Sequence, residues 1–167
     1  YALQVMEDFN QLKKDHPHFN EMITTLEISS NSHKYKPPEE KVNENRPDDL
    51  DAEREGIPTG SVTQYDPFNN KDRNGNIRNP KSGLIHETTH AYTADQGITY
   101  FFNDNEFRPI PGFELQAIIM ENIARKKYGD PLKRKYGKSN LVPEKYLTRN
   151  INQSLRTLLL IQRNCLP

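Results

Sequence analysis

The run H-E-T-T-H at residues 86–90 is the feature that most constrains how this chain folds. Two histidines four residues apart face the same way when the segment is an α-helix, because positions i and i+4 lie one turn apart on one helix face. Leu84 and Ile85 give the run an apolar entry, and Gly97 follows it at a place where a helix commonly ends. The sequence therefore predicts a helix over residues 83–95 that presents both imidazoles on one side.

The residue types in this run suit a metal site with a base beside it. Zinc suits the neutral imidazoles of His86 and His90, and in catalytic sites it keeps an open position for water. Glu87 neighbours the first histidine, and its carboxylate can accept a proton from a water molecule whose pKa zinc lowers. Such a run is expected by chance in on the order of one chain in a hundred of this composition. The pattern therefore predicts a zinc-dependent peptidase with Glu87 as general base.

Catalytic zinc usually has three protein ligands, so a third ligand must come from elsewhere in the chain. The metzincin extension is absent, because Gln96 stands where that pattern has its third histidine. Glu114 and Glu121 lie seven residues apart on one face of a second predicted helix, so either could bind the metal. Arg125 lies one turn beyond Glu121 and could orient it. The other histidines lie in polar or proline-flanked sequence and are expected to be ordinary surface residues: His16, His18 and His33.

Hydrophobic periodicity and turn residues divide the rest of the chain into expected elements. Helices are expected over residues 3–12, 19–26 and 113–128, with a last one beginning at Pro143. Short strands are expected over residues 26–28, 61–65 and 98–102. The segment 29–60 is polar and rich in Pro, Glu, Asn and Asp, which predicts a long loop with some mobility.

Length and composition limit the classes of protein to consider. A chain of 167 residues fits one domain, and residues 1–167 are taken as a single metallopeptidase domain, expected to be a monomer. Basic and acidic residues number 23 each, and this balance argues against nucleic acid or an anionic membrane as the main partner. No apolar run approaches the roughly 18–20 residues that cross a bilayer. Cys165 is the single cysteine, so no internal disulfide can form.

A longer series of residues resembles a known group, the bacterial effector metallopeptidases typified by the type III secreted protease NleD. The similarity covers residues 62–136, about half of the chain. It begins with a strand that ends in Tyr65-Asp66-Pro67 and continues through the H-E-x-x-H run. The remaining positions follow in the family's order: Glu114-Leu115, Glu121-Asn122, Arg125, Gly129, Pro131-Leu132 and Tyr136.

This resemblance implies an α+β, zincin-like domain with a small mixed sheet packed on the H-E-x-x-H helix and further helices. It implies a gluzincin-type site in which Glu114, rather than Glu121, is the third zinc ligand. Tyr136 would donate a hydrogen bond to the oxyanion, and Arg125 would support the site. The sequence departs from the family at Thr88-Thr89, where bulkier apolar residues are usual, and at Lys133, where an arginine is expected.

The family also implies a biological setting. Its members are delivered by bacteria into other cells, and the type member cleaves host signalling kinases. The resemblance thus predicts a secreted effector or toxin domain that cleaves a host protein in the target-cell cytosol. The single cysteine is consistent with that reducing compartment.

Two further expectations concern the substrate and the main alternative. Residues 61–65 are the candidate edge strand that binds substrate by strand addition. Tyr65 is then either a substrate contact or a half-buried strand aromatic. The alternative to an enzyme is a protein-interaction module that binds zinc without turnover, and it predicts bound metal without cleavage of any candidate substrate.

Overall fold

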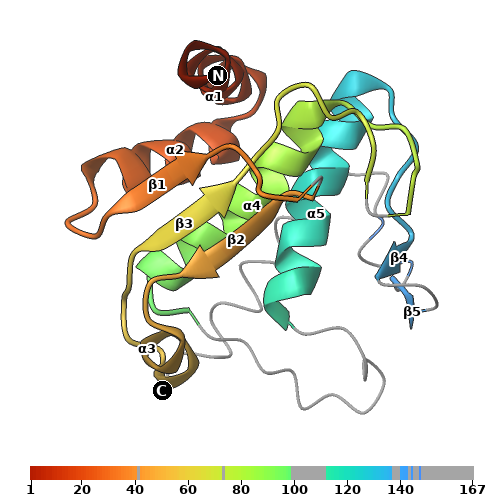
Figure 1. Ribbon diagram of the computed structural model, residues 1–167. Helices are drawn as coiled ribbons and strands as arrows, with labels where there is room; N and C mark the ends of the chain where they lie inside the picture. The colour runs from red at the N-terminus through yellow and green to blue at the C-terminus, as the bar shows by residue number, and fades with distance from the viewer. Residues whose placement is uncertain are drawn as a thin grey trace.

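The computed structural model describes residues 1–40, 42–72, 74–98, 112–136, 140–142, 144 and 147. Within these residues the chain forms an α+β domain with a small sheet and five helices (Figure 1), which confirms the predicted mixed class. The elements follow one another in this order: α1 (Ala2–Asp15), α2 (Pro17–Ile28), β1 (His33–Lys36), β2 (Glu44–Pro47), α3 (Leu50–Glu55), β3 (Ser61–Gln64), α4 (Pro80–Asp95), α5 (Gly112–Tyr128), β4 (Lys135–Tyr136) and β5 (Asn140–Leu141).

The main sheet is mixed and has the strand order β1-β3-β2. β1 runs parallel to β3, with His33 opposite Ser61, and β2 runs antiparallel to it, with Pro47 opposite Ser61. The predicted strand at 61–65 is therefore confirmed, but its predicted place at the sheet edge is wrong. Both sides of β3 are already hydrogen-bonded, so β3 has no free edge for a substrate. Among the described strands, the edge strand that packs against α4 is β2.

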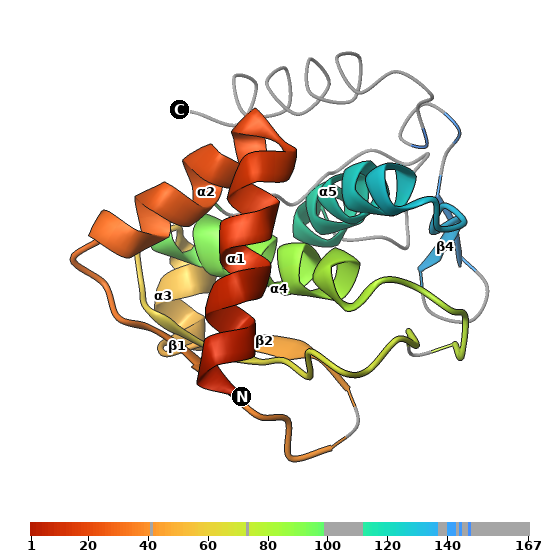
Figure 2. The same cartoon turned by 90° about the horizontal axis from the view of Figure 1, so that it is seen from above.

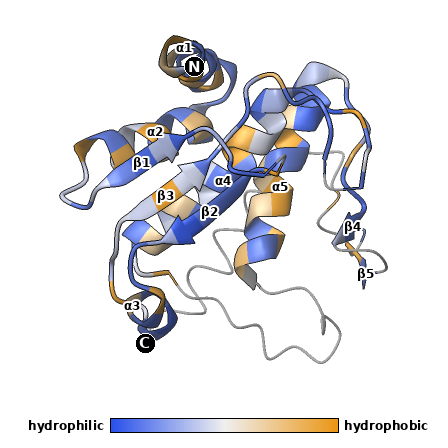
Figure 3. Ribbon diagram, in the orientation of Figure 1, coloured by the Kyte–Doolittle hydropathy of each residue, from blue (hydrophilic) through white to orange (hydrophobic). Residues whose placement is uncertain are grey.

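The prediction of a long loop over residues 29–60 is wrong, because this segment contains β1, β2 and α3. β1 has the sequence His-Lys-Tyr-Lys and β2 has Glu-Asn-Arg-Pro, so neither shows the alternation of apolar and polar residues that marks a strand. In Figure 3 both strands appear mainly in blue and pale shades. Their position comes from pairing with β3, a long-range interaction that local sequence does not reveal.

α4 lies between the sheet and α5, as Figures 1 and 2 show from two directions. Asn79 caps its first turn by accepting a hydrogen bond from the Lys81 backbone N–H, and Pro80 occupies the first helical position. Although α4 is rich in polar residues, nearly all of its side chains from Ser82 to Asp95 are buried, because the helix is covered on both sides. Gly97 follows with φ of +60°, as predicted for the residue after the helix.

The other helices supply the apolar core around α4. α5 is confirmed close to its predicted limits and is followed by Gly129 at φ of +75°. α1 buries Val5 and Leu12 and leaves Leu3 and Met6 exposed. The short strand predicted at 26–28 is wrong, because α2 continues through these residues. None of the helices in the described part of the chain is both long and apolar enough to span a membrane.

Two predicted elements lie outside the described residues. The strand expected at 98–102 has only its first residue described, and the helix expected from Pro143 has only residues 144 and 147 described.

Candidate metal site

The two histidines of the motif meet on the α5-facing side of α4. Their Nε2 atoms are 3.3 Å apart, and the ring planes are nearly perpendicular at 82°. The ligand atoms of His86, Glu87 and His90 all lie within 4.8 Å of one another, so this group can hold a metal ion. The prediction that a helix would bring the two imidazoles to one point is confirmed.

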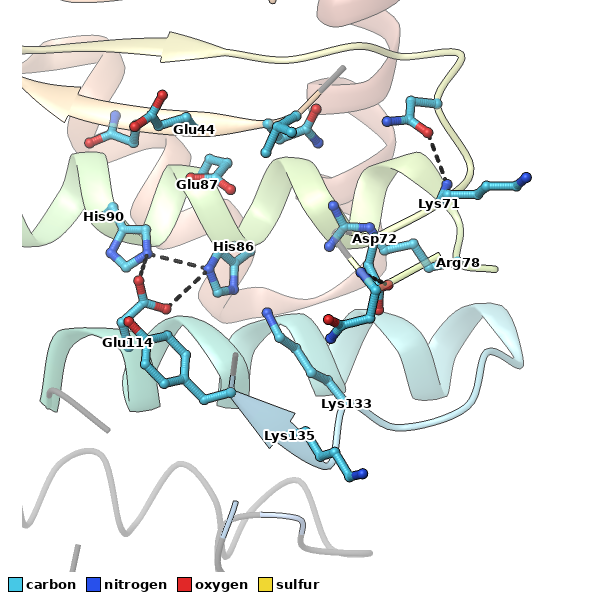
Figure 4. A pocket seen from close by; sticks show the side chains of 16 residues that line it. Glu44, Lys71, Asp72, Arg78, His86, Glu87, His90, Glu114, Lys133 and Lys135 are labelled. Atoms are coloured by element: carbon cyan, nitrogen blue, oxygen red, sulfur yellow. Dashed lines mark hydrogen bonds and ion pairs between the residues drawn. The ribbon is translucent and has the colours of Figure 1, made fainter. Parts of the chain in front are cut away.

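Glu114, in the first turn of α5, brings a second carboxylate to the same point. Its Oε2 lies 3.6 Å from His86 Nε2, and its Oε1 lies 3.7 Å from His90 Nε2. Figure 4 shows Glu114 reaching between the two imidazoles, while Glu87 lies on the side of α4 that faces β2. Bond lengths of about 2.0–2.1 Å in a tetrahedral zinc site separate neighbouring ligand atoms by about 3.3 Å. The three side chains His86, His90 and Glu114 therefore have spacings that suit one shared zinc ion.

Glu121 takes a different position relative to His86. Its Oε2 lies 3.0 Å from His86 Nδ1, the ring nitrogen that points away from His90. This contact has ion-pair distance, although the N–H direction misses the angle of a hydrogen bond. The two glutamates that spacing alone could not separate thus occupy different sides of one imidazole: Glu114 faces Nε2 and Glu121 faces Nδ1. A carboxylate at the second ring nitrogen orients a metal-binding histidine and raises its basicity.

Glu121 is fully buried and is held by three cationic side chains. Arg78 Nη1 donates to its Oε1 at 2.8 Å, Arg125 Nε donates to the same oxygen at 2.9 Å, and Lys133 Nζ donates to Oε2 at 3.0 Å. Burial raises the pKa of Glu121, but Lys133, His86 and Arg78 outweigh it and hold the pKa well below its usual range. The carboxylate is therefore ionised beside His86.

Arg125 joins this cluster to the loop that precedes α4. Its guanidinium contacts Asp72 Oδ2 at 3.2 Å and donates to the Pro131 backbone carbonyl at 2.9 Å. Asp72 in turn accepts hydrogen bonds from the backbone N–H groups of Asn74 and Asn76. The predicted supporting role of Arg125 thus has a structural basis: it positions Glu121 and fixes the loop beside the pocket.

The site shifts the pKa values of its carboxylates in opposite directions. Burial raises the pKa of Glu87, and the nearby Glu114 adds to that effect. Burial also acts on Glu114, but His86 and His90 oppose it and lower its pKa to about 2. Glu114 is therefore a carboxylate ready to bind a cation, whereas Glu87 has the higher proton affinity that a general base needs.

The histidines also differ from each other. Burial and the proximity of His86 lower the pKa of His90 to about 4, so its imidazole is neutral and can act as a metal ligand. For His86, burial and Lys133 lower the pKa, but Glu114 and Glu121 outweigh them and the net shift is upward. A cation placed between His86 and His90 would displace the proton that these two carboxylates favour.

The site opens into a pocket of about 410 Å³ between β2, α4 and the segment after α5. Tyr136, for which the resemblance predicts a contact with the oxyanion, lines this pocket and is half-buried. The lining residues come from five segments: Val42, Asn43, Glu44, Asn45, Asn69, Lys71, Asp72, Asn74, Arg78, His86, Glu87, His90, Glu114, Lys133, Lys135 and Tyr136.

Sequence reasoning missed Arg78 and Asp72 and noticed Lys133 only as a departure from the family pattern. Arg78 lies eight residues before His86 and carries no motif, so its contact with Glu121 depends on the path of the loop before α4. Gly83 makes room for it, because a Cβ at that position would collide with the Arg78 guanidinium and with Asn43. In the sequence, the only sign of this contact is Gly83 itself, a residue without a side chain one turn before Glu87, where another side chain can pack closely against the helix.

The structure corrects the predictions made for His33 and Tyr65. His33 is not a surface residue: its side chain is 4% exposed, and its ring contacts Asp95 Oδ1 and Ser61 Oγ, both at 3.0 Å. Tyr65 is not a substrate contact, because it is fully buried and donates a hydrogen bond to Asp8 Oδ2 at 2.7 Å. His33 and Tyr65 therefore join the sheet to the helices and lie away from the metal site.

We expect Tyr65→Phe to lower the free energy of unfolding by about 1.5–3 kcal/mol, because it removes a buried hydrogen bond to the charged Asp8. Urea denaturation measures this loss, and Tyr92→Phe is the control, since the hydroxyl of that half-buried tyrosine bonds none of the described residues. A variant as stable as the parent protein would show that the bond to Asp8 contributes nothing. Any cleavage activity should be unchanged at a temperature at which both proteins are folded.

Comparison with known proteins finds no match: no protein-family model, curated protein or solved structure aligns with this chain.

Proposed function

We propose that this chain is a zinc-dependent endopeptidase with a zincin-like fold. The observation that carries the proposal is the meeting of His86, His90 and Glu114 at spacings suited to one ion, with Glu87 on the adjacent turn of α4. His86 and His90 would bind zinc through Nε2 and Glu114 through its carboxylate. Two histidines and one carboxylate form a ligand set typical of catalytic zinc sites.

When bound, zinc polarises a substrate carbonyl and lowers the pKa of a water molecule. Glu87 accepts the proton of the attacking water at its carboxylate and delivers it to the nitrogen of the departing amine. Glu121 keeps His86 oriented, and Arg78 and Arg125 keep Glu121 ionised. Tyr136, which lines the pocket, would donate its hydroxyl hydrogen to the developing oxyanion, as the family resemblance implies.

The substrate would bind beside β2, which takes the place expected of residues 61–65. β2 is an edge strand, antiparallel to its neighbour, and Glu44 and Asn45 of this strand line the pocket. An extended peptide can add to such an edge through backbone hydrogen bonds. A mixed sheet packed on the H-E-x-x-H helix, with an antiparallel edge strand above it, supports the zincin-like interpretation.

The more specific proposal is a secreted bacterial effector or toxin domain similar to the NleD-like metallopeptidases. Its support is the order of residues from Tyr65 to Tyr136, together with the placement of Glu114, Glu121 and Arg125 at one site. The proposed substrate is a host protein, a signalling protein by analogy with the family, which the domain cleaves as a monomer in the target-cell cytosol.

The first test is the zinc content of the purified chain, measured by elemental analysis without added metal. We expect about one zinc ion per chain in the parent protein and none in His86→Ala, because a site of two ligands binds weakly. His18→Ala is the matched control, since it removes a half-buried histidine of α2 that contacts Glu21 at 3.5 Å and stacks on His16. Removal of zinc by a chelator should also lower the melting temperature, because an ion that binds the folded state stabilises it.

Absence of zinc from the parent protein under zinc-replete growth would overturn the proposal. Zinc binding without cleavage of any protein in a host-cell lysate, followed through newly formed N-termini, would instead favour the interaction module without turnover.

A further inference from the structure

The pocket beside the metal site carries opposite charges at its two ends. Glu44, Glu87 and Glu114 line the part around the histidines. Lys71, Lys133, Lys135 and Arg78 line the part nearer the start of α4, as Figure 4 shows. The three lysines are referred to below as the basic end of the pocket. Lys71 lies on the loop before α4 and Lys135 on β4, so two separate segments contribute to it.

The positive charge at the basic end is not neutralised by the described residues. Glu121 is shared by Arg78, Arg125 and Lys133, and the remaining carboxylate, Asp72, contacts Arg125. Five cations thus face two carboxylates. Neither Lys71 nor Lys135 pairs with a carboxylate in the described part of the chain, and both are exposed. An anionic group of a bound molecule would therefore find two lysines available to it.

The direction of β2 decides which half of a bound peptide reaches the basic end. Asn43, just before β2, lies beside Gly83 near the start of α4. The chain beyond β2 approaches the end of α4, where the Thr59 backbone N–H donates to the Ala94 carbonyl. β2 and α4 therefore run the same way. A peptide strand added antiparallel to β2 runs the opposite way, so its carboxyl-terminal half lies toward the start of α4.

We propose that the basic end selects a substrate with Asp or Glu within three residues on the carboxyl-terminal side of the cleaved bond. This inference rests on the proposed peptidase function, which supplies the position of the cleaved bond. A cavity of about 410 Å³ accommodates only a few residues of extended chain, each advancing about 3.3 Å, so the acidic residue lies close to the bond. A nucleic acid fits less well, because Glu44, Glu87 and Glu114 line the same pocket and repel a polyanion.

Peptide binding to the zinc-loaded Glu87→Gln chain tests the proposal separately from turnover. The probes are fluorescein-labelled octapeptides of alanine and serine around a central Phe-Leu pair. They carry two glutamates after the pair, two glutamates before it, or glutamines in both places. We expect the first peptide to bind about fivefold more tightly than the glutamine peptide at low salt, and the preference to shrink at high ionic strength.

The matched variants change charge without touching the metal site. Lys71→Glu combined with Lys135→Glu should abolish or reverse the preference for the first peptide. Lys34→Glu makes the same kind of change on the opposite edge strand, at an exposed lysine of β1, and should leave the preference intact. Circular dichroism checks that each variant is folded.

Equal binding of the three peptides, or no binding of any of them, would overturn the proposal. So would tighter binding when the glutamates precede the pair, or a preference that survives in the double lysine variant. Tighter binding of a ribo-oligonucleotide than of the acidic peptide would also overturn it. Acid-selective binding without cleavage of the same peptide by the parent chain would count against the peptidase function and leave the anionic site standing.

Discussion

Glu87→Gln is expected to lower kcat by about 10³-fold while the chain keeps its zinc. Glutamine has nearly the same shape as glutamate but cannot accept the proton of the attacking water. Proton transfer by a positioned side chain contributes about 10²–10⁴-fold to a rate. The metal should stay bound because His86, His90 and Glu114 supply the proposed ligands.

The environment of Glu87 explains why its loss should be so costly. The side chain is buried, and burial raises its pKa, so its proton affinity is higher than that of a carboxylate in water. None of the other three carboxylates among the described lining residues can replace it: Glu114 faces the two imidazoles with a pKa of about 2, Glu44 lies on β2, and Asp72 is paired with Arg125. A general base must combine reach with proton affinity, and Glu87 has both.

The measurement compares turnover of a cleaved substrate with zinc content in the same preparations. Glu21→Gln, at an exposed position of α2 far from the pocket, is the control and should keep full activity and full zinc content. Full activity of Glu87→Gln would refute its role as general base. Loss of zinc from Glu87→Gln would show instead that Glu87 is a metal ligand. This outcome has to be tested because the Glu87 carboxylate lies within 4.8 Å of the ligand atoms of both histidines.

Local sequence predicted the centre of this fold much better than its edges. α5 carries apolar periodicity, α4 carries the i, i+4 spacing of two histidines, and a glycine follows each helix, Gly97 and Gly129. Their limits could therefore be predicted within a few residues. β1 and β2 could not be predicted in the same way, because four-residue polar strands have no distinctive pattern and depend on pairing with β3. The strand that forms the edge of the sheet was therefore assigned to the wrong segment.

The candidate site shows the same limit. Spacing placed Glu114 and Glu121 on one face of α5, and the structure confirms that both reach His86. Spacing could not say which nitrogen of the imidazole each carboxylate would meet, because a separation of seven residues along α5 spans two helical turns and the answer depends on how α5 is set against α4. Arg125 lies one turn beyond Glu121 on α5 and could be predicted as its partner, but Arg78 and Lys133 come from the segments before α4 and after α5, and no local pattern predicts their contacts with Glu121.

The different surroundings of the two glutamates lead to opposite expectations for their alanine variants. Glu121→Ala should lower the free energy of unfolding by about 3–5 kcal/mol, because it leaves Arg78, Arg125 and Lys133 without the carboxylate they share in a buried position. Its effect on zinc affinity should stay within about 10–100-fold, the range found for groups that orient a ligand. Unfolding is measured in urea with a chelator present, so that zinc does not contribute.

Glu114→Ala should show the reverse pattern. The Glu114 side chain is 19% exposed and contacts the two histidines rather than a cluster of arginines, so its removal should change the metal-free stability by less than about 1 kcal/mol. Its zinc affinity should fall by more than about 100-fold, since the loss of a direct ligand exceeds the loss of an orienting group. Zinc affinity is measured by competition with a chromophoric chelator.

The pair of variants separates ligand from support without knowledge of the substrate. If Glu121→Ala lost more zinc affinity than Glu114→Ala, the assignment of the third ligand would be wrong. Glu121→Gln serves where the alanine variant does not fold, because it keeps the shape of the side chain and removes only the charge. It should lie between the parent and Glu121→Ala in stability, since the amide oxygen can still accept from Arg125 while the attraction between opposite charges is lost.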